Sequence, residues 1–513
     1  MTENKKEREE GIKQLAGQLE TIAKGASITF FGDFAGKGLG YLSQVVVARL
    51  LGVRFFGFYA LGFTLYKFTS LIAQLGLNNG VLHFVPKLKG QSNNSTARGV
   101  IRSGLFLSFL FGSVLTVGIY LGSPWISSSI FNEPELTGVI RSFSIGIPFF
   151  SLMMVALYST RSEKKMEYFV YVKNFQLQLS FLVIFLIAYL IGFRLYGATW
   201  AWVIATAGAC LISLFFLQKV FPGLMNNFEL RKIRKLLGFS LPLVLVGVLQ
   251  FLILWTDTFM LGALSSAENV GLYRAAVQTA LILGIFLRAF NSIFAPMISD
   301  LYHKGKKETL GFLFKTITRW IIILTSPIFV LILTAGGSLL KIFGPEFTVV
   351  WVPLAILGFA QLMDASMGPV GYILVMSGNQ KIEFYNVLTV ALLNIVLNYI
   401  MIPRFGMLGA ALATGSSVIV VNLLRLFTVS RKLGLWPYDR RELLKLVTGF
   451  TIVVSVGFSW QVLRPNMHFL LYLITAFLLI AIANFGLFFL FGTNESDRML
   501  LEVAKKAVLR VLW

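Results

Sequence analysis

The sequence is poor in charge for its length. Of its 513 residues, 13% are Asp, Glu, Lys or Arg and 56% are hydrophobic. Soluble domains carry roughly 25% charged residues, so about half of the usual charge is missing. The mean hydropathy of +0.77 agrees with this deficit. The composition excludes an ordinary soluble enzyme and indicates a chain that crosses a membrane many times.

Cysteine, histidine and motifs for nucleotide chemistry are also scarce. The single cysteine, Cys210, lies in an apolar stretch, so no disulfide framework exists. The histidines His83, His303 and His468 stand far apart and indicate no metal site. The chain lacks a Gly-rich phosphate loop, a nucleophile elbow and a CxxC pair. It therefore encodes no nucleotide-driven motor, and we expect no cofactor beyond coupling to Na⁺ or H⁺.

Long apolar runs are abundant. A spanning helix needs about 20 apolar residues, and the period-two alternation of a barrel is absent. We therefore predict an all-α polytopic membrane protein with 14 transmembrane helices. The predicted spans cover residues 25–50, 55–78, 99–122, 136–160, 168–191, 196–218, 236–262, 271–296, 310–334, 348–376, 382–402, 406–429, 443–463 and 467–491. Pro369 interrupts the tenth of these spans.

Lys and Arg are distributed unevenly between alternate loops. One set of loops holds most of them, including Lys5, Lys24, Lys87, Lys164, Arg231, Lys232, Lys304, Lys381, Arg431 and Lys505. The positive-inside rule then places both termini and these loops in the cytoplasm. The net charge of +22 is thus mainly topological, and we expect no nucleic acid as a partner. Residues 1–19 are polar and mixed in charge, so we expect no cleaved signal peptide.

An internal repeat divides the chain. Short matches recur in a common order at an offset of about 210 residues. One pairs Gly57-Phe58-Tyr59 with Gly271-Leu272-Tyr273. We predict two pseudo-symmetric six-helix lobes followed by two C-terminal helices. The segments are a cytoplasmic N-terminal segment (1–24), a first lobe (25–218), a basic linker (219–235), a second lobe (236–429), a basic loop (430–442), spans 13 and 14 (443–491) and a cytoplasmic tail (492–513).

Five charged residues within the predicted spans are candidates for substrate binding. Charges in hydrocarbon are costly, so they normally face a protein interior or a watery cavity. At about 1.5 Å per residue, Lys37 and Lys67 fall near the midplane. Asp33, Arg288 and Asp364 fall in the inner half. Cations lining a cavity would attract the negative charge of a diphosphate headgroup strongly.

Each of these residues also has a purely structural alternative. Asp33 and Lys37 have the i,i+4 spacing of an ion pair within one helix. Lys67 has no carboxylate nearby in its own span and would otherwise snorkel to the interface. Arg288 would otherwise pair with Asp364.

A second group of polar residues lies at matching depth in the outer half of spans 7, 11 and 12. It consists of Asp257, of Asn394 and Asn398 one turn apart on span 11, and of Thr414. All four side chains carry oxygen, which hard cations such as Na⁺ favour. The alternatives are a hydrogen-bonded cluster between helices and a proton carried by Asp257.

Three stretches resemble a known family. They read RLLGVRFFGFYAL at Arg49–Leu61, WTDTFMLGALSSAENVGLYRAA at Trp255–Ala276 and FGMLGAALATG at Phe405–Gly415. The chain resembles the polysaccharide flippases of the multidrug/oligosaccharidyl-lipid/polysaccharide (MOP) exporter superfamily, which includes O-antigen flippases, the lipid II flippase and MATE drug exporters. The resemblance implies a V-shaped pair of six-helix lobes with alternating access to a central cavity. It also implies a polyprenyl-diphosphate-linked oligosaccharide as cargo.

The resemblance extends to the second group of residues. The sodium site of lipid II flippases uses an Asp on span 7, two residues a turn apart on span 11 and a Thr on span 12. Here Asn398 stands where that pattern has a second Asp. The resemblance thus implies a Na⁺ site at Asp257, Asn394, Asn398 and Thr414, with one carboxylate instead of two.

We therefore expect a flippase that carries a lipid-linked oligosaccharide to the outer leaflet of the cytoplasmic membrane for cell-surface polysaccharide synthesis. Membrane lipids and polysaccharide polymerase or assembly proteins are its expected partners, and we expect a monomer. The main alternative is a MATE-type exporter of cationic drugs, which generally has twelve spans and an acidic cavity. A membrane glycosyltransferase, polymerase or ligase would need a larger catalytic loop than this chain has. A non-transporting scaffold would leave the charges within the spans unexplained.

Overall fold

The computed structural model describes residues 2–91, 93–224, 232–463 and 467–490, in which every regular element is a helix. The first elements are α1 (Thr2–Ala73), α2 (Leu77–Gly90), α3 (Asn94–Trp125), η1 (Ile126–Ile130), α4 (Leu136–Ser144), α5 (Ile147–Arg161), α6 (Met166–Val170), η2 (Tyr171–Gln176), α7 (Leu177–Leu190), α8 (Arg194–Val220) and α9 (Ile233–Leu264). They are followed by α10 (Ala267–Ala280), α11 (Ile285–His303), α12 (Lys307–Leu340), η3 (Pro345–Val350), α13 (Trp351–Met367), α14 (Val370–Met376), α15 (Gln380–Leu433), α16 (Arg440–Leu463) and α17 (Phe469–Leu490).

Eleven helical stretches in the described ranges are long and apolar enough to cross a membrane. A twelfth is added if α10 and the first part of α11, which are bent by 48°, form one broken span. The prediction of an all-α, multi-pass membrane protein is therefore confirmed.

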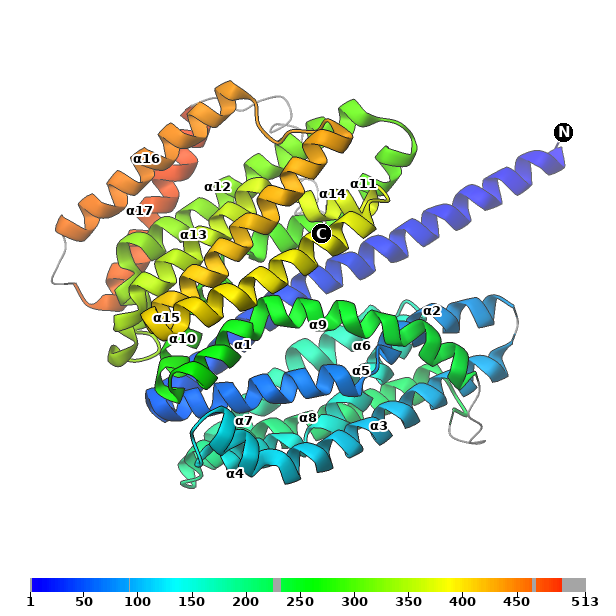
Figure 1. Cartoon of the computed structure of the whole chain (residues 1–513). Coiled ribbons are helices and arrows are strands. Elements are labelled where there is room, and N and C mark those ends of the chain that lie inside the picture. Colours follow the sequence, from blue (N-terminus) through cyan, green and yellow to red (C-terminus); the bar gives the residue numbers. More distant parts are fainter. Residues whose placement is uncertain (1, 92, 225–231, 464–466, 491–513) are drawn as a thin grey trace. The chain divides into compact units, whose positions relative to one another are not determined.

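Two of these stretches are too long for a single crossing. Helix α15 has 54 residues, about 80 Å at about 1.5 Å per residue, whereas the hydrocarbon core is about 30 Å thick. At Gly406 its backbone takes φ 55°, a conformation that glycine adopts at little cost. Glu383 and Arg425, 42 positions apart, are hydrogen-bonded across this point, so α15 folds back on itself. Helix α1 has a similar break at Gly52, with φ 75°, and Figure 1 shows it doubling back.

The first compact unit contains residues 1–271. Its core includes Val81, Ile101, Val155 and Leu217, which α2, α3, α5 and α8 contribute. Helix α9 belongs to this unit because it packs against α1, α2 and α3, whereas the repeat assigns residues 236–262 to the second lobe. Small residues permit the close packing: a Cβ on Gly80 would lie 2.2 Å from Ser240 Oγ.

A symmetric contact joins two segments that the repeat pairs. A Cβ on Gly57 would lie 1.8 Å from the carbonyl oxygen of Ala267. A Cβ on Gly271 would lie 2.2 Å from the carbonyl oxygen of Val53. The same sequence offset separates Val53 from Ala267 and Gly57 from Gly271. The contact therefore has local two-fold character, and both of its glycines are needed for the backbones to approach.

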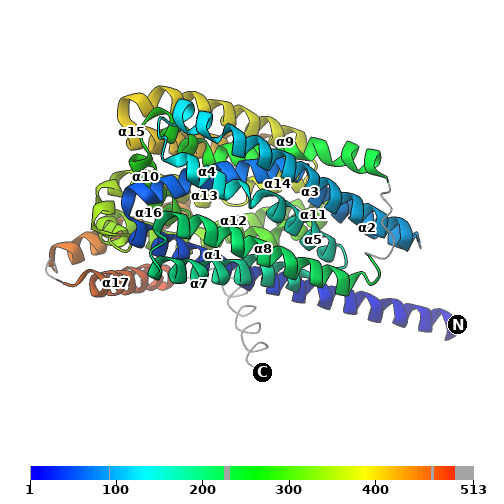
Figure 2. The ribbon, with the colours of Figure 1, turned by 90° about the horizontal axis from the view of Figure 1, so that it is seen from below.

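The second unit contains residues 272–513. Helices α12, α13 and α15 pack together, and α16 and α17 cover α12 through Val330, Val453, Leu473 and Ile480. Both views show α16 (orange) and α17 (red) side by side (Figure 1 and Figure 2). The expected interruption of the tenth span is present: α13 ends at Met367, and α14 begins at Val370 after Pro369.

Candidate substrate and ion sites

The ammonium group of Lys67 lies among aromatic rings of unit 1. Its Nζ is 4.2 Å from the ring centroid of Phe150, 5.1 Å from that of Phe63 and 5.3 Å from that of Trp202. The Tyr66 ring is 5.9 Å away. These rings come from α1, α5 and α8. Because aromatic faces attract cations, they hold the half-buried ammonium among the helices.

Two further cations lie near Lys67. Lys173 interacts electrostatically with Lys67, Arg161 and Asp33. Its Nζ is 4.8 Å from the ring centroid of Phe169, and the Arg161 Cζ is 4.7 Å from the same centroid. We call Lys67, Arg161 and Lys173 the cationic cluster of unit 1. Asp33 is the carboxylate that interacts with Lys173, so these described interactions bring together three cations and one carboxylate.

Close helix packing places Asp33 beside this cluster. A Cβ on Gly32 would lie 2.1 Å from Val170 Cγ1, and one on Gly36 would lie 2.5 Å from Asn174 Cβ. Helix α1 therefore approaches α6 and η2 closely. Asn174 Nδ2 donates to Asp33 Oδ1 at 2.7 Å. Lys37, one turn further along α1, has an exposed side chain. Its ion pair with Asp33 stays a prediction.

Sequence reasoning missed Lys173, Asn174 and Arg161. Lys173 falls inside the predicted span 168–191, so its charge was an available signal. The π-helical turn η2, which carries Lys173 and Asn174, has no signature in hydropathy. Such π-helical turns occur frequently at functional sites.

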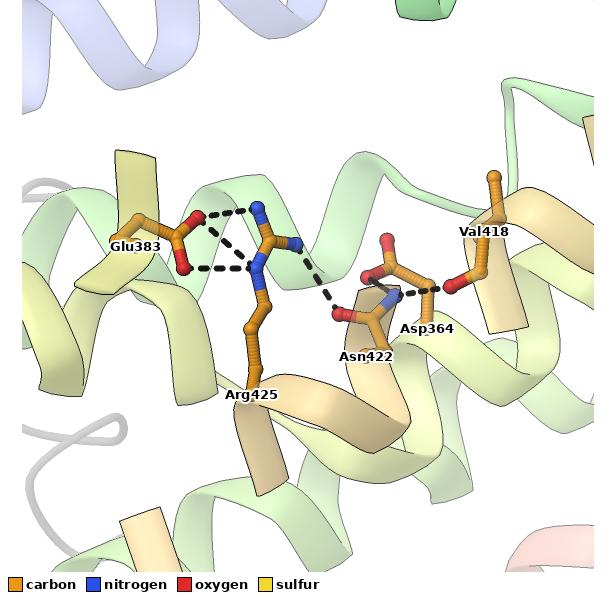
Figure 3. Close-up of polar contacts among 5 residues, drawn as sticks. All are labelled: Asp364, Glu383, Val418, Asn422 and Arg425. Carbon is orange, nitrogen blue, oxygen red and sulfur yellow. Dashed lines mark hydrogen bonds and ion pairs between the residues drawn. The ribbon is translucent and has the colours of Figure 1, made fainter. Parts of the chain in front are cut away.

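In unit 2, Asp364 belongs to a chain of polar contacts (Figure 3). Asn422 Nδ2 donates to Asp364 Oδ1 at 2.8 Å. Arg425 Nη1 donates to Asn422 Oδ1 at 3.2 Å, and Arg425 Nε donates to Glu383 Oε1 at 2.9 Å. This network joins α13 to both halves of α15. Sequence reasoning missed Asn422, Arg425 and Glu383 as site residues, although both charges lie inside predicted spans.

Arg288 lies next to the break between α10 and α11. Its Nη2 donates to the carbonyl oxygen of Leu281 at 2.8 Å, a carbonyl that lies between the two helices. Arg288 also interacts electrostatically with Asp364. Its side chain is exposed, so donors of the guanidinium can reach a ligand.

Three of the four candidate ion ligands lie together in unit 2. Asn394 Nδ2 is 3.5 Å from Thr414 Oγ1 and 3.2 Å from Ser417 Oγ. Asn398 Nδ2 donates to Asn394 Oδ1 at 3.1 Å. Asn398 Oδ1 is buried, and among the described residues no donor reaches it. Ser417 was not predicted, although it lies on span 12 one turn beyond Thr414.

Asp257 lies on α9 in unit 1, 3% exposed. The backbone amide of Thr258 donates to its Oδ1 at 2.6 Å. The other three candidate ligands lie in unit 2, so the joint site of Asp257 with Asn394, Asn398 and Thr414 stays a prediction. Elsewhere in the described part of the chain, no group of three His, Cys, Asp or Glu side chains is placed to hold a metal.

Comparison with known proteins identifies the family. Residues 22–302, more than half of the chain, match the family model described as "Polysaccharide biosynthesis protein". The chain belongs to this family. Residues 242–400 of this polysaccharide biosynthesis family member also match the MatE family model. The resemblance to the flippases of the MOP superfamily is thereby confirmed.

Relatives and solved structures agree with this assignment. An uncharacterized membrane protein of Methanocaldococcus jannaschii is 21% identical over 469 residues, which cover 86% of this chain and 90% of the relative. A probable flippase of Haloferax volcanii, AglR, is 24% identical over 419 residues, covering 79% and 82%. The lipid II flippase MurJ, in an inward closed conformation, has a TM-score of 0.74 at 15% identity, covering 90% of this chain and 99% of MurJ. The protein is therefore a membrane transporter with a MOP-superfamily fold.

Proposed function

We propose that this protein flips a polyprenyl-diphosphate-linked oligosaccharide from the inner to the outer leaflet of the cytoplasmic membrane. The observation that carries the proposal is the cationic cluster of unit 1, in which Lys173 interacts with Lys67, with Arg161 and with one carboxylate, Asp33. A diphosphate would supply the missing negative charge through charge-assisted hydrogen bonds. A fold shared with the lipid II flippase and a probable flippase among the relatives support the same cargo class.

We also propose that the chain crosses the membrane fourteen times and works by alternating access. The eleven candidate spans and the bent pair α10 and α11 account for twelve crossings. Counting α1 and α15 twice, because each doubles back, brings the number to fourteen. An even number keeps both termini in the cytoplasm, as the loop charges favour. The symmetric contact at Gly57 and Gly271 supports two repeated lobes, which would rock around a central site.

A Na⁺ ion coupled to transport is a further part of the proposal. Asn394, Asn398, Thr414 and Asp257 would hold it. Two features of these residues suit a Na⁺ ion. Asn398 Oδ1 is a buried acceptor that no donor in the described ranges reaches, and all four side chains offer oxygen atoms, which Na⁺ prefers as ligands. A bound Na⁺ would supply positive charge that ties Asp257 to the span 11 and span 12 residues. Protonation of Asp257 would neutralise the same carboxylate without an ion.

A MATE-type exporter of cationic drugs is the second candidate. The MatE family model matches residues 242–400, a shorter stretch than 22–302. The excess of cations in unit 1 would repel a cationic drug, so this alternative is less favoured. We further propose that the chain works as a monomer among membrane lipids and passes its cargo to polysaccharide polymerase or assembly proteins.

Ligand-induced thermal stabilisation of the purified protein tests the cargo. A ligand that binds only the folded state raises the melting temperature. We expect a polyprenyl-diphosphate sugar to raise it, and a cationic drug to leave it unchanged, with and without Na⁺. Flipping of a labelled lipid-linked sugar in reconstituted vesicles then tests transport. Stabilisation by the drug alone, with no flipping of the sugar, would favour the exporter instead.

A further inference from the structure

A small cavity lies between α12, α16 and α17, with a mainly apolar lining and a few polar side chains. It has a volume of about 50 Å³. Its polar lining comes from Arg319 and Ser326 on α12, Glu442 and Lys445 on α16, and Asn484 on α17. Helices α16 and α17 form the two spans that follow the twelve spans of the repeat. Transport by two six-helix lobes gives these two spans no role.

The described residues that line the cavity include two cations and one carboxylate. Arg319 Nη1 is 2.9 Å from Glu442 Oε2, and Lys445 Nζ is 3.2 Å from Glu442 Oε1. Two cations thus share the one carboxylate found among the residues that line the cavity. The side chain of Arg319 is only 10% exposed, and its Cζ lies 5.1 Å from the ring centroid of Phe488. Positive charge at such a buried position is weakly screened, so an anion would be attracted strongly.

Hydrogen bonds of the other polar side chains hold the walls of the cavity in place. Asn484 Nδ2 donates to the carbonyl oxygen of Ile323 at 2.9 Å, and Ser326 and Asn484 are hydrogen-bonded at 3.0 Å. These bonds join α17 to α12, while the ion pair of Arg319 with Glu442 joins α16 to the same helix. A ligand would therefore meet a preformed site.

The size of the cavity limits its occupant. One water needs about 10–15 Å³ of such volume, so about 50 Å³ holds roughly four water-sized groups. This matches a phosphate group and is too small for an oligosaccharide. The site is thus distinct from one for the transported sugar.

The position of the cavity indicates where the phosphate comes from. Glu442 and Lys445 lie in the first turns of α16, and Asn484 and Phe488 lie near the end of α17. The cavity is therefore at the membrane face that the loop charges place in the cytoplasm. Next to it, α16 exposes large apolar side chains, Leu444 at 71% and Val447 at 57%, which suit contact with acyl chains.

We propose that this cavity binds the phosphate of an anionic phospholipid of the inner leaflet, held by Arg319 and Lys445. Basic pockets between transmembrane helices on the cytoplasmic side bind anionic lipid headgroups elsewhere. The bound lipid fastens α16 and α17 to α12. The proposal concerns a resident lipid and does not depend on which cargo is transported.

The test compares two lysine variants of the full-length protein in detergent after delipidation. Lys445→Ala removes a cation of the cavity that is 38% exposed in its side chain, so folding should tolerate it. Lys315→Ala is the matched control: it lies on α12, pairs with Asp439 at 2.6 Å and does not line the cavity. The melting temperature is measured against added phosphatidylglycerol, phosphatidylcholine or inorganic phosphate.

We expect phosphatidylglycerol, but not phosphatidylcholine, to raise the melting temperature of the original protein and of Lys315→Ala. In Lys445→Ala the apparent affinity for phosphatidylglycerol should fall about fivefold. Equal responses of the two variants, or no response of the original protein, would overturn the proposal. If inorganic phosphate alone reproduces the whole stabilisation, the site binds free phosphate and the lipid assignment is wrong.

Discussion

Replacing Lys67 by methionine should separate the function of this residue from its packing. Methionine keeps the length and flexibility of the side chain and removes the charge. The variant loses the attraction between the ammonium and the rings of Phe63, Phe150 and Trp202, about 0.5–2 kcal/mol. It also removes the desolvation cost of a half-buried charge, several kcal/mol in the interior of a protein. We therefore expect the free energy of unfolding of the unliganded protein to stay constant or to rise.

Substrate binding should change in the opposite direction. A hydrogen bond to a charged group contributes about 1.5–3 kcal/mol, and each 1.4 kcal/mol is about a factor of ten in affinity. Lys67→Met should thus bind a polyprenyl-diphosphate sugar about 10- to 100-fold more weakly. Flipping should slow in proportion at substrate concentrations below the dissociation constant.

The assay combines thermal unfolding without ligand, ligand titration and flipping in vesicles. Lys67→Arg, which keeps a cation, should retain part of the affinity even though its geometry differs. Lys304→Met is the control, because Lys304 pairs with Asp300 at 2.8 Å and is 60% exposed. Unchanged affinity in Lys67→Met would refute the assignment of this lysine to the substrate. A fall in melting temperature together with a loss of binding would show a structural role instead.

The other predictions concern both units. Arg288→Ala should abolish flipping in vesicles while the melting temperature and the membrane level stay normal, because its side chain is exposed and its hydrogen bond to the Leu281 carbonyl is local. Asp257→Asn should remove any Na⁺ dependence of transport; a dependence that persists in vesicle assays would place the ion elsewhere. Gly271→Ala should lower stability by about 1–3 kcal/mol in thermal unfolding, because its Cβ would lie 2.2 Å from a carbonyl oxygen.

Hydropathy predicted the helical spans, and the predicted boundaries at residues 50–55 and 402–406 coincide with the breaks at Gly52 and Gly406. A long apolar run must form helix in a membrane because its backbone polar groups have no other partners there. The number of crossings depends on reversals, and those at Gly52 and Gly406 involve single residues with positive φ. Neither reversal interrupts the hydropathy pattern with a polar loop. The sequence repeat groups α9 with the second lobe because the two halves of the chain are similar in sequence. The unit that α9 packs against is a separate matter, because it depends on the contacts of one conformation.

The candidate sites were predictable where a charge stands alone in an apolar run. Lys67, Arg288 and Asp364 were found in this way. Their partners were harder to predict, because contacts such as Asn422 with Asp364 join residues 58 positions apart. Lys173 and Arg425 carry the same signal as Lys67, a charge within a predicted span.

The two units differ in how their intramembrane cations are balanced, and this difference bears on function. In unit 2, Arg425 contacts Glu383, and Arg288 interacts with Asp364. In the described part of unit 1, Lys173 interacts with two other cations, Lys67 and Arg161, and with one carboxylate, Asp33. A buried excess of charge is costly unless a ligand of opposite charge offsets it. Unit 1 therefore has the stronger electrostatic reason to bind an anionic substrate, whereas the Arg425–Glu383 pair of unit 2 is better suited to hold the two halves of α15 together.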